Sequence, residues 1–269
     1  MINYIEPIKV LSKYIKNYFI VETNNSIDFL PKERVYPCGY ATMVFHYGFP
    51  SKFQKKNSSK YIEPNIVICG QQTNYYDLSL SGKTGMILIV FRPHGVKSFF
   101  DFPITELLNE NLSLKDLTNN EAIELEDKLF ISQNNKQRIS HLENFFIKRL
   151  ITYGEGFAVH NSEFERVEHA IKLIENSKGQ NKAQDIAHEV CLGIKQFERT
   201  FSKYVGINPK KFASIVRFQN VIQQMKKKNE NLSMSRLAFD NGYYDQSHFI
   251  HDFKSLTGLA PKAFFNNKK

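Results

Sequence analysis

The chain carries two copies of one pattern: residues 190–212 read VCLGIKQFERTFSKYVGINPKKF, and residues 242–264 read GYYDQSHFIHDFKSLTGLAPKAF. Six positions are identical at a constant offset of 52 residues, namely the pairs Phe197/Phe249, Phe201/Phe253, Gly206/Gly258, Pro209/Pro261, Lys210/Lys262 and Phe212/Phe264. Matches at one fixed distance indicate an internal duplication. The duplication decides how the C-terminal part of the chain folds.

Each copy predicts a helix, a tight turn and a second helix. In the first copy, Phe197, Phe201 and Tyr204 fall at i, i+4 and i+7, which is the spacing of an apolar stripe on a helix. The matching helix of the second copy follows Asp245, a residue that suits the N-cap position. Two helices joined by a tight turn form the helix-turn-helix unit, whose second helix can enter the major groove of DNA.

Residues 209–227 predict one helix between the two copies, with Pro209 in its first turn. At about 1.5 Å per residue this helix spans roughly 28 Å. Successive major-groove faces on one side of DNA lie about 34 Å apart. A helix of this length can therefore hold two recognition helices about one DNA turn apart within a single chain.

Positive charge gathers in the same part of the chain. Of the net charge of +9, residues 161–269 hold +7, from 18 Lys and Arg against 11 Asp and Glu, and residues 1–160 hold +2, from 18 against 16. A basic segment suits nucleic acid, because each phosphate that is neutralised by Lys or Arg releases counterions. A solvated basic surface, or a plain helical bundle, is the alternative. A bundle explains the buried Phe positions, but not the two outward faces of hydrogen-bonding side chains.

These motifs resemble the DNA-binding domain of the AraC/XylS family of bacterial transcriptional regulators, over about residues 164–265. The resemblance rests on residues 242–249, 253–254 and 257–261 in the second copy, and on residues 186–187, 196–201 and 206–209 in the first. We expect DNA contacts from the outward faces of the two recognition helices, at Lys195, Gln196, Glu198, Arg199, Gln246, Ser247, His248, Ile250, His251 and Lys254. Nearby cations suit phosphate contacts or solvated charge: Lys203, Lys210, Lys211 and Arg217.

Two residues depart from the family pattern. Gly193 stands where the family often has Ser before the first recognition helix, and His251 stands where it usually has Arg in the second. Arg199 suits bidentate pairing with guanine, and Gln246 suits pairing with adenine. The first helix is therefore predicted to dominate affinity.

Residues 1–118 predict a β-rich domain. Short apolar runs at residues 42–47, 65–69 and 86–91 are bounded by Gly and Pro, as in a small barrel or sandwich. This half resembles the cupin-like N-terminal domain of a subset of AraC-type regulators, on residues 37–39, Gly70 and residues 91–95. A small effector would sit at the barrel mouth. The candidates by residue type are Tyr36, Tyr40, His46, Gln71, Tyr75, Tyr76, Arg92 and His94.

Residues 119–153 predict helices at 121–130 and 137–153, with an apolar stripe at Leu142, Phe145, Phe146, Leu150 and Ile151. The stripe suits either dimerisation or packing on the barrel, and the sequence does not separate the two. Residues 154–161 are the expected linker to a DNA-binding domain at 162–267. The fold class is therefore α+β with two domains: a β-rich cupin-like barrel with linker helices, and an all-α double helix-turn-helix domain.

The sequence offers no catalytic constellation. His46 and His94 have no spaced carboxylates around them, and there is no phosphate-binding Gly loop or GxSxG motif. We therefore expect no enzyme activity, cofactor or metal. The alternative is an enzyme or repair protein with a barrel or thiol catalytic domain, using Cys38, and a DNA-binding tail.

The composition limits the cellular compartment and the binding partners that we expect. The longest apolar run, residues 86–91, is far shorter than the roughly 20 residues of a membrane-spanning helix. Three cysteines without a close pair suit a reducing cytoplasm. The expected partner is double-stranded DNA, and a small effector, a second copy of the chain and RNA polymerase are further candidates.

Overall fold

The computed structural model of the chain describes residues 2–23, 33–55, 59–80, 82–118, 120–153, 162–227 and 233–266. The expected linker at residues 154–161 lies outside the described residues.

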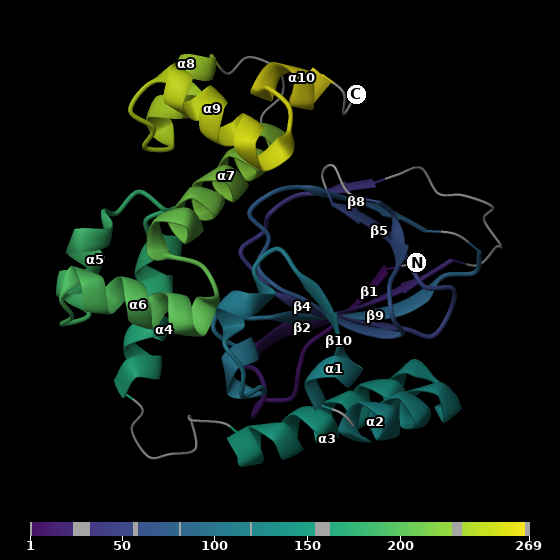
Figure 1. Ribbon diagram of the computed structural model, residues 1–269. Coiled ribbons are helices and arrows are strands. Elements are labelled where there is room, and N and C mark those ends of the chain that lie inside the picture. Colours follow the sequence, from purple (N-terminus) through teal and green to yellow (C-terminus); the bar gives the residue numbers. More distant parts are fainter. Residues whose placement is uncertain are drawn as a thin grey trace.

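The N-terminal half forms two antiparallel sheets (Figure 1). Its strands are β1 (Ile2–Ile5), β2 (Ile15–Glu22), β3 (Glu33–Val35), β4 (Thr42–His46), β5 (Lys52–Lys55), β6 (Tyr61–Ile62), β7 (Ile66–Cys69), β8 (Tyr76–Ser79), β9 (Gly85–Phe91) and β10 (Asn111–Ser113). The six-stranded sheet has the order β1-β2-β9-β4-β7-β10, and the four-stranded sheet has the order β3-β8-β5-β6. The three strands that were predicted from apolar runs are confirmed as β4, β7 and β9.

The expected barrel is not closed. Among the described strands no hydrogen-bonded ladder joins the two sheets. The strands of the smaller sheet are only two to four residues long, so they offer few backbone groups for continuing the ladder around a barrel. The β-rich architecture was predicted correctly, but its closure was not.

Three helices follow the sheets: α1 (Leu114–Thr118), α2 (Asn120–Ile131) and α3 (Asn135–Tyr153). The ring of Phe146 in α3 packs edge-on against Phe91 of β9, with ring centroids 5.6 Å apart. Leu142 and Leu150 are buried on the same stripe, whereas Ile151 is exposed. Most of the apolar stripe therefore packs on the sheet of its own chain, which was one of the two interpretations of this segment.

The C-terminal half is entirely helical within the described residues. Its helices are α4 (Ser162–Asn176), α5 (Ala183–Glu189), α6 (Ile194–Val205), α7 (Pro209–Lys227), α8 (Met234–Asp240), α9 (Gln246–Thr257) and α10 (Pro261–Asn266). The two predicted helix-turn-helix units are α5–α6 and α8–α9, and α7 joins them (Figure 1). The sequence repeat and the linking helix are thus confirmed.

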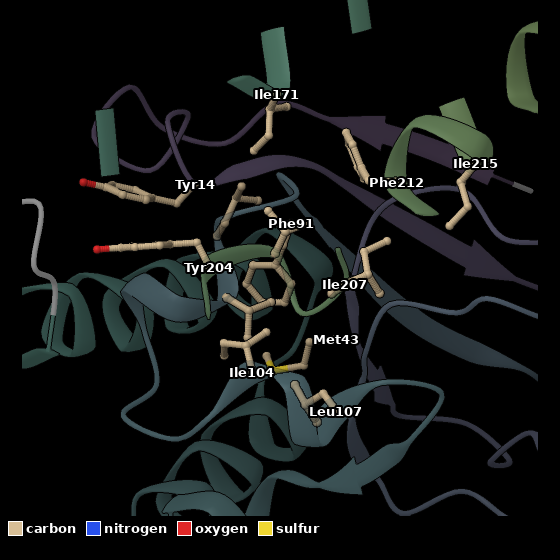
Figure 2. Close-up of a cluster of buried hydrophobic side chains, with 14 of the residues drawn as sticks. Tyr14, Met43, Phe91, Ile104, Leu107, Ile171, Tyr204, Ile207, Phe212 and Ile215 are labelled. Atoms are coloured by element: carbon tan, nitrogen blue, oxygen red, sulfur yellow. The ribbon is translucent and has the colours of Figure 1, made fainter. Parts of the chain in front are cut away.

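One hydrophobic core runs through both halves. Figure 2 shows the place where they meet, with side chains from the sheets and from the helices in one cluster. The N-terminal half contributes Tyr14, Met43, Phe91, Ile104 and Leu107, and the C-terminal half contributes Ile171, Tyr204, Ile207, Phe212 and Ile215. Ile104 and Leu107 belong to a 3-10 helix, η2 (Ile104–Leu107), which follows another short one, η1 (Val96–Ser98). The two halves therefore share a packed interface.

Candidate nucleic-acid interface

Helix α6 presents a polar face and buries an apolar one. Phe197 and Phe201 lie at 1% and 0% exposure, which fixes the rotation of the helix on the core. The four residues of α6 that were predicted to contact DNA are all exposed: Lys195, Gln196, Glu198 and Arg199. They lie on the face turned away from the core.

Helix α9 repeats this arrangement. Phe249, Phe253 and Leu256 are fully buried. The predicted contact residues Gln246, Ser247, His248, His251 and Lys254 are exposed. Ile250 differs, because it is half-buried and packs against the core. Its side chain therefore has less surface to offer to DNA than its neighbours.

The two recognition helices begin differently. Asp245 caps α9 by accepting a hydrogen bond from the backbone N–H of His248 at 2.7 Å. Gly193 is the N-cap of α6 and makes no side-chain cap. Since free N–H groups at a helix start need partners, the start of α6 depends more on solvent or a ligand.

Two contacts within the second unit orient its polar side chains. Ser235 of α8 donates a hydrogen bond from its hydroxyl to Oε1 of Gln246 at 2.9 Å. The His248 ring stands edge-on to Tyr243, with centroids 5.5 Å apart. Gln246 is thus held from the neighbouring helix, and its oxygen keeps a second lone pair for a further donor.

Two of the cations expected at the DNA backbone have partners inside the protein. Arg217 of α7 donates from Nη1 to the Gly179 carbonyl at 2.7 Å. Lys203 of α6 pairs with Glu163 of α4 at 3.0 Å. Arg217 therefore has a partner in the turn after α4, and a DNA contact by its remaining N–H groups stays a prediction.

The residues proposed for an effector at a barrel mouth do not form one cluster. Tyr36 packs against Phe218 and Phe264 of the helical half, with ring centroids 6.4 and 5.0 Å away. Tyr75 lies under the Arg34 guanidinium, 3.9 Å from ring to cation. Both tyrosines serve the interface between the halves.

Others of these candidates belong to the interior of the sheets. His46 is fully buried, with Nε2 3.2 Å from Oε2 of Glu63. Gln71 is buried and donates to the Gly39 carbonyl at 2.9 Å. The Tyr76 ring stacks on Phe53, with centroids 4.5 Å apart.

Three of the candidates do line one cavity. Tyr40, Arg92 and His94 border a groove of about 480 Å³ between the sheet half and α4. Its remaining lining residues are Ser12, Lys13, Lys16, Pro93, Glu168, Ile171, Lys172 and Glu175. The groove thus has four cationic side chains against two carboxylates. Desolvation raises the pKa of the Glu175 carboxyl above its ordinary value. Of the two carboxyl groups in the groove, Glu175 therefore holds its negative charge less readily than Glu168.

His94 is the buried titratable group of this groove. Its Nε2 lies 3.2 Å from the Lys13 carbonyl, and its ring stands edge-on to Phe164 of α4 at 4.8 Å. Burial lowers the pKa of His94 to about 4, although the nearby Glu168 carboxylate acts in the opposite direction. At neutral pH the imidazole is therefore uncharged.

Three further features bear on other kinds of site: metal ligands, membrane-spanning helices and the Cys38 thiol. Within the described ranges, no group of three or more His, Cys, Asp or Glu side chains could hold a metal ion. The helices described here include none with the length and apolar character needed to cross a bilayer. Cys38 is exposed, and its Sγ donates to the Tyr40 carbonyl at 3.7 Å.

Comparisons with known proteins agree with the geometry of the helical half. Residues 186–267 match a family described as a helix-turn-helix domain. Residues 186–267 are a helix-turn-helix domain of the AraC type. Residues 3–113 match a family described only as a domain of unknown function.

One similar protein is an uncharacterized helix-turn-helix transcriptional regulator of Haemophilus influenzae. It is 23% identical over 117 residues, which are 44% of this chain and 38% of the relative. This chain therefore covers well under half of that relative's length.

Solved structures of ToxT from Vibrio cholerae are similar along most of the chain. One of them has a TM-score of 0.45 at 15% identity and covers 93% of this chain and 97% of its own. Another, with unsaturated fatty acid bound, has a TM-score of 0.41 at 17% identity and covers 92% of this chain and 94% of its own.

Sequence reasoning found the recognition helices but missed Arg34 and Ile104. Both lie in the N-terminal half and contact the C-terminal ends of the recognition helices. One signal was present, because Gly206 and Gly258 are among the six repeat identities. These two glycines mark the helix ends that the N-terminal half contacts, but they do not indicate that Ile104 and Arg34 make the contacts.

Proposed function

We propose that this protein is a sequence-specific DNA-binding transcriptional regulator that reads two successive major grooves. One observation carries the proposal: α6 and α9 are repeat-related, expose polar and cationic faces, and are joined by α7 within one AraC-type domain. The excess positive charge of residues 161–269 supports it, because it favours a polyanionic partner.

Each recognition helix has an assigned role in this proposal. Lys195 and Arg199 supply charge and guanine recognition from α6, while Gln246 and Ser247 supply neutral hydrogen bonds from α9. Gln196, Glu198, His248, His251 and Lys254 border these contacts, and Ile250 contributes only at its exposed edge.

The groove beside α4 is the proposed effector site. Lys13 and Lys172 of this groove pair with Glu168, and Lys16 and Arg92 favour a small anionic molecule. The volume of the groove falls in the usual range of ligand pockets. Because the groove is bordered by both halves, a bound molecule would act on how they are packed together. A second copy of the chain and RNA polymerase are further proposed partners.

The alternative, an enzyme or repair protein that uses Cys38, is disfavoured. Cys38 is exposed and donates from Sγ to the Tyr40 carbonyl at 3.7 Å, and the helix-turn-helix match of residues 186–267 supports the regulator instead. We propose that the chain has no catalytic role.

Selection of duplexes from a random DNA library by the full chain tests the proposed function. We expect enrichment of a site with two half-sites about one helical turn apart, and affinity that falls steeply as salt rises. Failure to enrich any sequence, or a flat salt response, would contradict the proposal.

A further inference from the structure

Both recognition helices end on a glycine that the N-terminal half covers. Gly206 ends α6 with φ +83°, and Gly258 ends α9 with φ +75°, a left-handed conformation that costs glycine little. A Cβ atom on Gly206 would lie 3.1 Å from Cγ2 of Ile104, and one on Gly258 would lie 2.5 Å from Cε1 of Tyr75. The same point of each repeat therefore touches the N-terminal half.

The contact on α6 is apolar. Ile104 of η2 is 5% exposed and belongs to the core that both halves share. Ile207, directly after Gly206, is 4% exposed in the same cluster. Burial of apolar surface holds this end of the first helix.

The contact on α9 is polar. Arg34 of β3 donates from Nη1 to the Thr257 carbonyl at 3.4 Å and from Nε to Oδ1 of Asp77 at 3.1 Å. Its guanidinium also stacks over the Tyr75 ring at 3.9 Å. The Thr257 carbonyl is among the last of α9, which lack helical partners and attract a cation. Arg34 thus caps the second recognition helix from the other half of the molecule.

We propose that the N-terminal half sets the distance and orientation between the two recognition helices by holding both of their C-terminal ends. The positioning residues are Ile104 on α6 and the Arg34–Tyr75 pair on α9. This inference rests on the proposed function, since it states how α6 and α9 are kept at the spacing that two successive major grooves require. Helix α7 joins the two units from one side, and the N-terminal half supplies a second connection.

Fixed spacing has a consequence for DNA. One base pair inserted between two half-sites moves them apart by about 3.4 Å and rotates them by roughly 35°. Recognition helices held at two points cannot follow that change, whereas helices joined by α7 alone have more freedom. The contacts from the N-terminal half therefore determine which half-site spacing is accepted.

A distance measurement without DNA tests the positioning directly. Spin labels are placed at Lys195→Cys and His251→Cys in the full chain, in a background carrying Cys38→Ser and Cys191→Ser, the exposed cysteines. We expect one narrow label-to-label distance distribution in this reference protein. It should broaden in Arg34→Ala and Tyr75→Ala and stay narrow in Lys9→Ala, which removes an exposed charge from the same half. An unchanged distribution in both test variants would overturn the proposal.

A spacing series tests the consequence. Duplexes selected by the wild-type chain are altered by one or two base pairs between the half-sites, and affinities are compared. We expect the wild type to lose about tenfold or more, a loss of the size that one mismatched base pair causes. Arg34→Ala should lose less than about threefold relative to its own best site, and Arg34→Lys should fall between, because it keeps the charge but not the planar fork.

The same spacing profile in wild type and Arg34→Ala would overturn the inference and leave the proposed function standing. If the wild type selects no sequence, the proposed function fails, and the label-to-label distances still decide whether the N-terminal half positions the helices.

Discussion

The first helix-turn-helix unit and the second bury the same residue types at repeat-related positions. Phe201 and Phe253 are both fully buried, 52 residues apart. Their exposed faces differ, because α6 presents Lys195 and Arg199 at the positions where α9 presents Ser247 and His251. The repeated residues thus specify how each unit folds, and the residues between them specify what each unit contacts.

The two units also differ in how they are held. The first docks through apolar packing at Ile104, and its Tyr204 packs against Phe164 of α4, which contacts the uncharged His94. The second is held by the Arg34 hydrogen bond to Thr257. Apolar burial is nearly independent of salt, whereas a cation at a partly exposed carbonyl is not, so the second unit has the more easily released contact.

The largest expected effect is the loss of stability when an equivalent buried ring of either unit is removed. Phe201→Ala and Phe253→Ala should each lower the free energy of unfolding by about 3–5 kcal/mol, because each removes a fully buried ring. Chemical denaturation of the full chain measures both. Similar losses of stability would support equivalent cores in the two units. A loss under about 1 kcal/mol in one variant would show that the two cores are not equivalent.

Acid should act on the packing of α4, which connects the first unit to the N-terminal half. The pKa of His94 lies at about 4 in the folded chain, against 6.5 for an ordinary histidine, chiefly because the ring is buried. Between those values the unfolded chain binds a proton that the folded chain does not. Stability should therefore fall by up to about 3 kcal/mol as pH drops from 6.5 to 4.

Denaturation at several pH values in His94→Gln tests this dependence. Glutamine keeps an N–H donor for the Lys13 carbonyl but does not titrate. The fall in stability over this pH range should shrink in His94→Gln and persist in His251→Gln, which changes an exposed imidazole. An equal fall in wild type and His94→Gln would show that other groups cause it.

The exposed faces should contribute unequally to DNA binding. Arg199→Ala should cost about 1–3 kcal/mol of affinity and relax base preference at one position of the first half-site. His251→Ala should cost less, and His251→Arg should raise affinity if the new charge meets a phosphate. Titrations with a selected duplex at several salt concentrations measure these effects. Equal losses in Arg199→Ala and His251→Ala would refute the ranking of the helices.

The helix starts should give the smallest effects. Asp245→Ala should lower the free energy of unfolding by about 1 kcal/mol, because it removes the hydrogen bond to the His248 N–H. Gly193→Ser should raise it by a few tenths of a kcal/mol, since Gly193 has extended backbone and open space around its Cα. Thermal or chemical denaturation detects both, and a destabilised Gly193→Ser would contradict the open geometry.

Much of the candidate site could be predicted from local pattern. The spacing of Phe197 and Phe201 fixed which residues of α6 face out, and Asp245 marked the start of α9. Ile250 was placed with the contact residues because it lies between outward positions, but its side chain is half-buried. Helical periodicity alone does not determine whether a residue at the border of two helix faces is buried or exposed.

The candidate effector residues show what residue type alone does not determine. Tyr36 and Tyr75 suit a pocket by residue type, yet they pack against the helical half. Their partners Phe264 and Gly258 lie about 180 to 230 positions along the chain. Periodicity carries information over a few turns of helix and none over such separations.

The sequence by itself determined the two helix-turn-helix units, the helix between them and the β-rich N-terminal half, because these follow from repeats and from hydrophobic periods of a few residues. Only the tertiary structure decided that the sheets do not close into a barrel and that both halves share one core. It alone placed Arg34 at the end of α9 and His94 against Phe164. Those contacts join residues far apart in the chain, and they exist only once packing has chosen which surfaces meet.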